Sequence, residues 1–171
     1  MADDYFLKID GIEGESTDAR HKGEIALDAW SFGGTAGSVA GKPSGPTRPG
    51  IASGRFNAQD FQFTAKASKA SPKLFEACAT GTRLRDVTLF ARKAGDEKQE
   101  YLRIRLTDVG ISSYQQGGSS GVSDAPAEQV SCNFASIEIE YKEQRHDGSL
   151  GGSVTAKVDV KKIKSIRAKS R

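Results

Sequence analysis

Alternation of apolar and polar residues, repeated in segment after segment, constrains the fold of this chain more than any other feature. With a period of two, alternate side chains point to opposite faces of an extended strand, and one face can be buried. The segments with strand-like patterns are Tyr5–Ile9, Ile25–Trp30, Arg55–Lys66, Val87–Arg92, Leu102–Leu106, Asp108–Gln116, Glu128–Tyr141 and Val154–Lys161. They predict a mainly β fold, a barrel or a sandwich of about 7–9 strands, in which the last strand lies at an edge.

One segment, near residues 71–80, predicts a short α-helix. Ser71 suits the N-cap, Pro72 suits the first turn and Gly81 suits the C-terminal stop. The expected apolar face consists of Leu74, Phe75, Cys78 and Ala79. Because so short a helix is not stable alone, we expect this face to pack against strands.

The longest candidate strand, Glu128–Tyr141, changes phase midway. Apolar residues occupy even positions up to Phe134 and odd positions from Ile137 onward. Side chains alternate strictly along a strand, so the change predicts a β-bulge or a change of packing environment near Ala135-Ser136.

Two glycine-rich segments interrupt the strand pattern. Residues 33–54 are rich in glycine, proline and serine without periodicity, and residues 110–121 hold a second cluster of glycines. Loops of about 20 residues are uncommon in compact domains and are usually functional or disordered. The stretch Ala36–Pro43 resembles a phosphate-binding loop in outline, but it lacks the first glycine and the final hydroxyl, so we expect no nucleotide site.

Charge is unevenly distributed along the chain. Residues 157–171 contain seven Lys or Arg and one Asp, a balance of +6, and since the net charge is +3 the other 156 residues carry −3. We interpret this basic extension as a solvated end or a protein contact. Nucleic acid is the less favoured partner because no aromatic residue interleaves the lysines.

No catalytic, cofactor-binding or metal-binding residues are predicted. His21 and His146 lie in polar segments without a nucleophile motif, and we expect His21 at the surface of a turn. Cys78 and Cys132 lack metal-site spacing and are expected to be reduced thiols in the core. The first residues show no signal-peptide pattern, and no run is long and apolar enough to enter a membrane.

Short motifs nevertheless follow one another in a distinctive order. Strand residues 6–12 lead into Gly14-Glu15-Ser16, followed by Asp18 and His21 in the spacing GES-D--H. Further motifs are Glu24-Ile25, Ala29–Gly33, Gln59–Phe61, Ala70–Leu74, Ala77–Gly81, Arg92–Gly95, Tyr101-Leu102, Ser112–Gly118, Asn133–Ala135 and Asp147-Gly148. Over roughly residues 5–150 this order resembles the haemolysin-coregulated protein (Hcp) family, with departures at residues 34–54 and after Val160.

The resemblance implies one Hcp-like β-barrel domain over residues 1–171, with a basic C-terminal extension from about 157. It implies a structural protein and not an enzyme. Hexameric rings would stack into the inner tube of a type VI secretion system and carry effectors in the lumen. The implied partners are further copies of the chain and the sheath, spike and effector proteins. Assembly would be cytoplasmic, followed by type VI export without a signal peptide.

Candidate site residues follow from this picture. Ser31 ends a strand on the same parity as Ile25, Leu27 and Ala29, so it is a candidate for the lumen wall and for effector binding. An exposed strand end is the equal alternative. The candidates for ring stacking are the loop residues Gly37, Gly41, Lys42, Gly117 and Gly118, with mobile loops as the alternative.

Two other classes of function stay open. A stand-alone β-sandwich binding module has the same strand content, although a sugar-binding module would normally expose aromatics and Trp30 is the only tryptophan. An exported effector on the same scaffold is the other alternative. Only about 30 residues follow Tyr141, which is too few for an independent catalytic domain.

Overall fold

A computed structural model describes residues 3–37, 55–93, 98–121 and 125–161 of the chain. Its elements are β1 (Asp4–Ile9), β2 (Ile25–Ser31), β3 (Gly34–Gly37), β4 (Arg55–Ala58), β5 (Phe61–Lys66), α1 (Ser71–Thr80), β6 (Arg83–Arg92), β7 (Glu100–Gly117), β8 (Ala127–Gln144) and β9 (Leu150–Asp159). The mainly β prediction with one short helix is confirmed.

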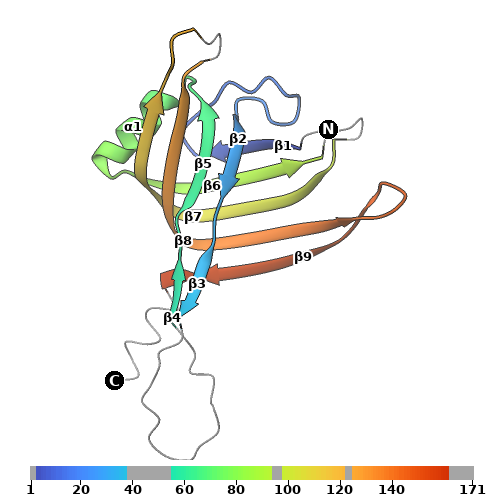
Figure 1. Cartoon of the computed structure of the whole chain (residues 1–171). Coiled ribbons are helices and arrows are strands. Elements are labelled where there is room, and N and C mark those ends of the chain that lie inside the picture. Colours follow the sequence, from blue (N-terminus) through green and yellow to red (C-terminus); the bar gives the residue numbers. More distant parts are fainter. Residues whose placement is uncertain (1–2, 38–54, 94–97, 122–124, 162–171) are drawn as a thin grey trace, which may run out of the picture.

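The strands close into a barrel. The main sheet has the order β5-β2-β1-β6-β7-β8-β9, and β5 also pairs with β8, so six strands form a ring and β9 extends it at an edge (Figure 1). In Figure 1, β2 and β5 form the front of the barrel with the upper parts of β7 and β8, while β1, β6 and the lower part of β7 form the back. The expected edge position of the last strand is confirmed.

Side chains fill the interior of this barrel. The largest of these buried side chains come from strands on both sides of the barrel and are less than 2% exposed, among them Phe61, Phe63, Leu7, Leu89 and Ile104. A six-stranded barrel is narrow enough for side chains to occupy its inside. Any binding by the described residues therefore takes place on outer surfaces.

Helix α1 has the predicted bounds but a different buried face. Gly81 adopts the left-handed conformation that ends the helix, as expected. The N-cap is Ala70 and not Ser71, whose hydroxyl instead accepts a hydrogen bond from the Ser68 amide at 2.9 Å. The buried residues are Ser71, Leu74 and Ala77, whereas Phe75 is 60% exposed. The prediction grouped Phe75 with Leu74 because both are apolar, but adjacent helical positions diverge by about 100°.

Register shifts interrupt the pairing between neighbouring strands at several positions. One lies in β2 between Leu27 and Ala29 and another in β7 between Ile111 and Ser113. Near Ala135-Ser136 the β7–β8 register is continuous, so the bulge predicted there is wrong. The alternative, a change of packing environment, is confirmed, because β8 exchanges β5 for β9 as its second neighbour between Cys132 and Ser136.

The ends of two predicted segments also differ from the structure. Residues 34–37 pair with 55–58 as the β3–β4 hairpin, so the irregular segment expected over 33–54 is wrong for residues 34–37, and residues 38–54 lie outside the described part of the chain. Strand β9 covers Leu150–Asp159, whereas the pattern predicted Val154–Lys161, so the strand begins and ends earlier than expected. Within the described residues, no helix has the length and apolar character needed to span a bilayer.

Candidate assembly surfaces

The front of the barrel carries two rows of uncharged residues, which we call the uncharged wall. Cross-strand pairing places Ser31, Gln62, Ser131 and Ser113 in one row across β2, β5, β8 and β7. The adjacent row consists of Ala29, Thr64, Gln129 and Gln115. Small or amide side chains thus cover four neighbouring strands without a charge in either row.

Ser31 is exposed on this wall, but not for the reason expected from its parity. Ile25 and Leu27 point into the core, and the register shift at Asp28 then reverses the alternation. Trp30 therefore packs against the core, while Ala29 and Ser31 point outward. A shared face with Ile25 and Leu27 was wrong, because a single extra residue moves all later side chains to the other face.

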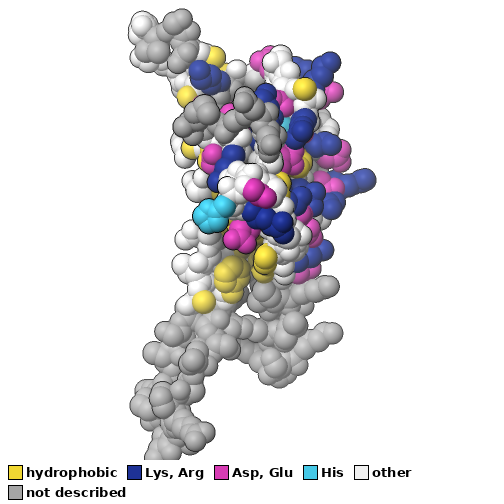
Figure 2. All heavy atoms as spheres, turned by 90° about the vertical axis from the view of Figure 1, so that its right-hand side faces the viewer, with side chains coloured by type: hydrophobic (Ala, Val, Ile, Leu, Met, Phe, Trp, Pro, Cys, Tyr) yellow, Lys and Arg dark blue, Asp and Glu magenta, His cyan; other side chains and the backbone are white. Residues whose placement is uncertain are grey.

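The outer surface on the opposite side of the barrel carries charged residues, and we call it the charged wall. One row across five strands consists of Lys8, Thr88, Arg105, Glu138 and Lys157. Arg105 forms an ion pair with Asp86 of the neighbouring row at 3.1 Å, and Arg103 forms one with Glu140, its cross-strand partner on β8. Lys8, Arg105 and Glu138 are among the side chains that line a shallow basin of about 520 Å³. In Figure 2, charged side chains gather towards the right-hand margin, which corresponds to the back of the barrel in Figure 1.

The glycine candidates for stacking lie at opposite ends of the subunit. Gly37 ends β3, in the hairpin at the bottom of Figure 1, where it pairs with Arg55. Gly117 ends β7 at the top, opposite Ala127, and the next residue, Gly118, lies beside Pro126. Gly41 and Lys42 are outside the described residues.

A buried ion cluster fixes the segment between β1 and β2 against the barrel. Arg92 is 2% exposed and donates to Asp18 at 2.9 and 3.0 Å and to Asp4 at 2.8 Å. Its guanidinium also lies 4.9 Å from the centre of the Phe6 ring. Hydrogen bonds from Arg92 hold the pKa of Asp18 well below its ordinary value. Arg92, at the end of β6, thereby holds both Asp4 at the start of β1 and Asp18 in the segment between β1 and β2.

His21 belongs to the same buried region, so its predicted surface position is wrong. It is 2% exposed and stacks on Phe6 with ring centres 4.4 Å apart. Its Nδ1 lies 2.8 Å from Glu24, and its Nε2 lies 3.1 Å from Glu100 outside hydrogen-bonding geometry. Burial is the main cause that raises the pKa of Glu24. Polar sequence around His21 concealed this packing, although outward-facing Phe6 on β1 was a signal that something must cover it.

The remaining reactive residues match the expectation in part. Cys132 is buried, and burial raises its pKa to about 12, while Cys78 is only half-buried on α1. Both are free thiols. In the described ranges, no group of three His, Cys, Asp or Glu residues is arranged to hold a metal ion.

Two exposed apolar patches were not predicted from the sequence. Phe75 on α1 lies 5.6 Å from the Tyr114 ring, measured between ring centres. On the other side of the subunit, Tyr141 is 48% and Val154 is 72% exposed. Apolar alternation on the last strand was the available signal, because Val154 and Ala156 of β9 share one face and are both exposed.

Known proteins with the same fold and sequence pattern identify the family. The family model described as "Type VI secretion system effector, Hcp" matches residues 6–141. Protein hcp1 of Pseudomonas aeruginosa is 40% identical over 153 residues, which cover 89% of this chain and 91% of that protein. The crystal structure of Hcp1 from Salmonella typhimurium is 33% identical with a TM-score of 0.74, covering 95% of this chain and 97% of that one.

A further structure, described as a type six secretion system protein, has a TM-score of 0.86 at 26% identity, with coverage of 94% and 98%. The agreement extends over nearly the whole barrel in sequence and in structure. This chain therefore belongs to the Hcp family of the type VI secretion system, a family of structural tube proteins and not of enzymes.

Proposed function

We propose that this chain is a structural subunit of the type VI secretion inner tube, in which hexameric rings stack, are exported and carry effectors in the lumen. The observation that carries this proposal is the division of a filled barrel into an uncharged wall and a charged wall. A subunit with a filled interior can enclose cargo only by arranging copies around a common space. Closed rings of one chain need two different surfaces that meet head to tail.

The uncharged wall is the surface that we assign to the lumen. Ser31, Gln62 and Gln129 offer hydrogen bonds to a protein cargo without the long-range attraction of fixed charge. Such a surface suits cargo that must be held and then released. Ser31 at the end of its row is the candidate effector contact.

The charged wall is then the outer surface of the ring, where the sheath is the expected partner. Arg103, Arg105 and Glu138 present both signs of charge, which favours orientation-specific contacts with a complementary surface. Exposed ion pairs contribute little to folding, so these residues are free to serve an interface.

Ring stacking is assigned to the two ends of the subunit. The β3–β4 hairpin, which includes Gly37, projects at one end, and the Gly117-Gly118 turn lies at the other, as stacking of one ring on the next requires (Figure 1). Gly41 and Lys42, outside the described residues, remain proposed stacking contacts. Spike protein would bind the terminal ring through the same surfaces.

The remaining parts of the proposal concern the chain as a whole. Residues 1–171 act as one domain, since β9 pairs with β8 beyond the part matched by the family model. Subunits fold in the cytoplasm and leave through the secretion machine without a signal peptide.

Light scattering of the purified full-length protein tests this proposal. The expected mass is about six times the 18.3 kDa of one chain, and negative-stain images should show annular particles. A monomer at every concentration would contradict the proposal. It would favour a stand-alone binding module or an effector that travels as a single subunit.

A further inference from the structure

Strand β9 has an apolar face that the subunit leaves uncovered. Val154, Ala156 and Val158 lie on the same side as Tyr141 and Ile139 of β8, in rows that continue from the barrel core. Val158 is half-buried against that core, whereas Val154 at the far end is 72% exposed. We call Tyr141, Val154 and Ala156 the sheet patch.

A second apolar surface lies on the helix. Phe75 is 60% exposed, and it packs beside Tyr114, whose hydroxyl donates to the buried Glu128 at 2.9 Å. This hydrogen bond fixes the ring on which Phe75 rests. Pro72 and Phe75 also line a shallow groove of about 540 Å³. We call Pro72, Phe75 and Tyr114 the helix patch.

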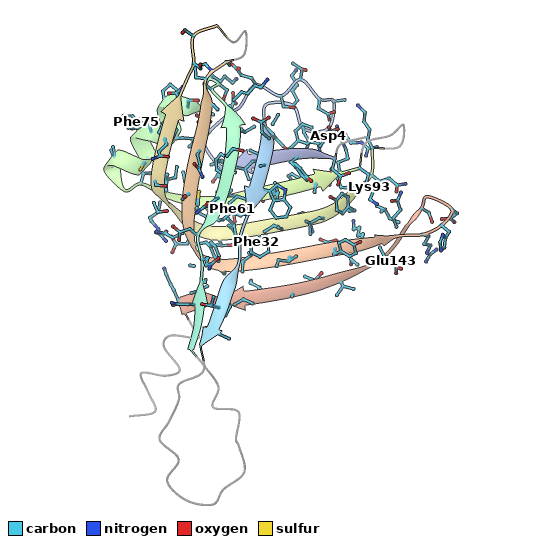
Figure 3. All side chains as sticks on the ribbon, in the orientation of Figure 1. Asp4, Phe32, Phe61, Phe75, Lys93 and Glu143 are labelled. Carbon is cyan, nitrogen blue, oxygen red and sulfur yellow. The ribbon has the colours of Figure 1, made fainter. Side chains whose placement is uncertain are left out.

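The two patches lie on opposite sides of the subunit. In Figure 3 the helix with Phe75 is at the left, and Glu143, two residues beyond Tyr141 on β8, is at the right. Figure 2, which views that right-hand side, shows hydrophobic side chains between the charged margin and the uncharged margin. Helix α1 with Phe75 therefore lies on the opposite side of the subunit from the end of β8 that carries Glu143.

We infer that the helix patch of one subunit packs against the sheet patch of the next copy in the ring. This inference rests on the proposed function, because it takes the partner to be a second copy of this chain. A heterologous contact needs two different surfaces, and only a pair on opposite sides can propagate around a ring. With the uncharged wall facing the lumen and the charged wall facing outward, these two sides are the ones that neighbours meet.

The chemistry of the patches supports the pairing. Among the described residues, the exposed large hydrophobic side chains are Phe32, Phe75, Tyr141 and Val154. Phe32 already stacks on Trp30, with ring centres 6.2 Å apart. The other three belong to the two patches. An aromatic side chain packed against an exposed apolar sheet face is the kind of contact that contributes most to the stability of interfaces.

Cysteine cross-linking tests the contact directly. In the Cys78→Ser background, Phe75→Cys and Val154→Cys are introduced together and treated with a short bis-maleimide. Cys132 is retained, because its burial and raised pKa of about 12 keep it unreactive. On a denaturing gel we expect a covalent ladder extending to hexamer, whereas a mixture of the two single-cysteine chains should stop at dimer.

Controls separate the contact from chance reaction and from loss of assembly. Lys8→Cys with Val154→Cys, which joins the charged wall to the sheet patch, should give no ladder. Ala79→Cys with Ala156→Cys keeps Phe75 and Val154 in place and should give the same ladder if the first pair weakens assembly. Dimers formed by Val154→Cys alone would indicate a symmetric contact and overturn the inference.

Native mass spectrometry distinguishes the inference from the proposed function. Hexamers without a ladder from either cysteine pair would overturn the assigned contact and leave the tube proposal intact. Monomers of the unmodified protein would overturn both. In addition, Phe75→Asp and Val154→Asp should each give monomers alone, but a 1:1 mixture should give heterodimers, because one intact contact is restored.

Discussion

At the scale of single residues, the buried pair of Arg92 and Asp18 is the most sensitive point of the subunit. Arg92 is 2% and Asp18 is 12% exposed at the side chain, and their contact joins the segment before β2 to the end of β6. A charge taken out of water is tolerated only while its partner remains. This dependence makes the pair a sharp test of the described packing.

We expect Asp18→Asn to lower the free energy of unfolding by about 3 kcal/mol, because it leaves Arg92 buried with an incomplete set of acceptors. Urea unfolding at one fixed protein concentration measures the change. Asp86→Asn is the matched control: its partner Arg105 is 54% exposed, so a loss below about 1 kcal/mol is expected. Equal losses in the two variants would show that Asp18 and Arg92 are not buried together.

Asp18 also makes stability depend on pH in a defined direction. Its pKa in the folded protein is held below the ordinary 3.8, so it contributes stability above about pH 4 that is lost as the pH falls towards the folded pKa. The difference between wild type and Asp18→Asn should therefore be full at neutral pH and shrink below about pH 4. Other acidic groups cancel in this comparison. A difference unchanged down to about pH 3 would contradict the assignment.

The same region shows what residue patterns alone could not predict. His21, Asp18 and Glu24 lie in a polar stretch, which favours a surface turn. Their burial depends on Phe6 and Arg92, which are distant in sequence and meet them only after the barrel forms. The order of motifs in the sequence singled out Asp18 and His21, but their burial could be seen only in the folded barrel.

At the scale of elements, local signals predicted bounds better than faces. Pro72 and Gly81 act within the helix itself, and α1 begins and ends where they indicate. The register shift at Asp28 depends instead on how β2 pairs with β5, so the exposure of Ser31 could be predicted but its strand face could not. The change of neighbour along β8 was likewise visible as a change of phase, while its cause required the topology.

Truncation of two adjacent helix residues should change the free energy of unfolding by very different amounts. Leu74 is 0% exposed, so Leu74→Ala should cost about 3 kcal/mol through lost burial and a cavity. Phe75→Ala should change subunit stability by less than about 0.5 kcal/mol, because Phe75 is mostly exposed. Urea unfolding in the Val154→Asp background isolates the fold from association. A larger loss from Phe75→Ala would mean that the helix is rotated from the described orientation.

The helix stop gives a second test at this scale. Gly81 has φ of +67°, and a Cβ added there would meet no atom within 4 Å, so only backbone strain opposes Gly81→Ala. The expected cost is about 1 kcal/mol in thermal or urea unfolding. Gly117→Ala, also without nearby atoms but without positive φ, should be close to neutral. Identical effects in both variants would argue against a left-handed C-cap.

At the scale of the whole molecule, the proposed function depends on the outer surfaces of the subunit and not on a catalytic cleft. The barrel is filled, its two walls differ in charge, and two apolar patches are exposed. Each surface has one proposed neighbour: cargo at the uncharged wall, sheath at the charged wall, the adjacent subunits at the side patches and the next rings at the two ends. A single orientation of the subunit satisfies all of these assignments.

Cryo-electron microscopy of the purified full-length protein tests that orientation most directly. The account predicts a closed hexameric ring in which Ser31 and Gln62 line the bore and Arg103 and Arg105 lie on the outer circumference. A ring with the charged row lining the bore would contradict it, and so would particles that remain single subunits.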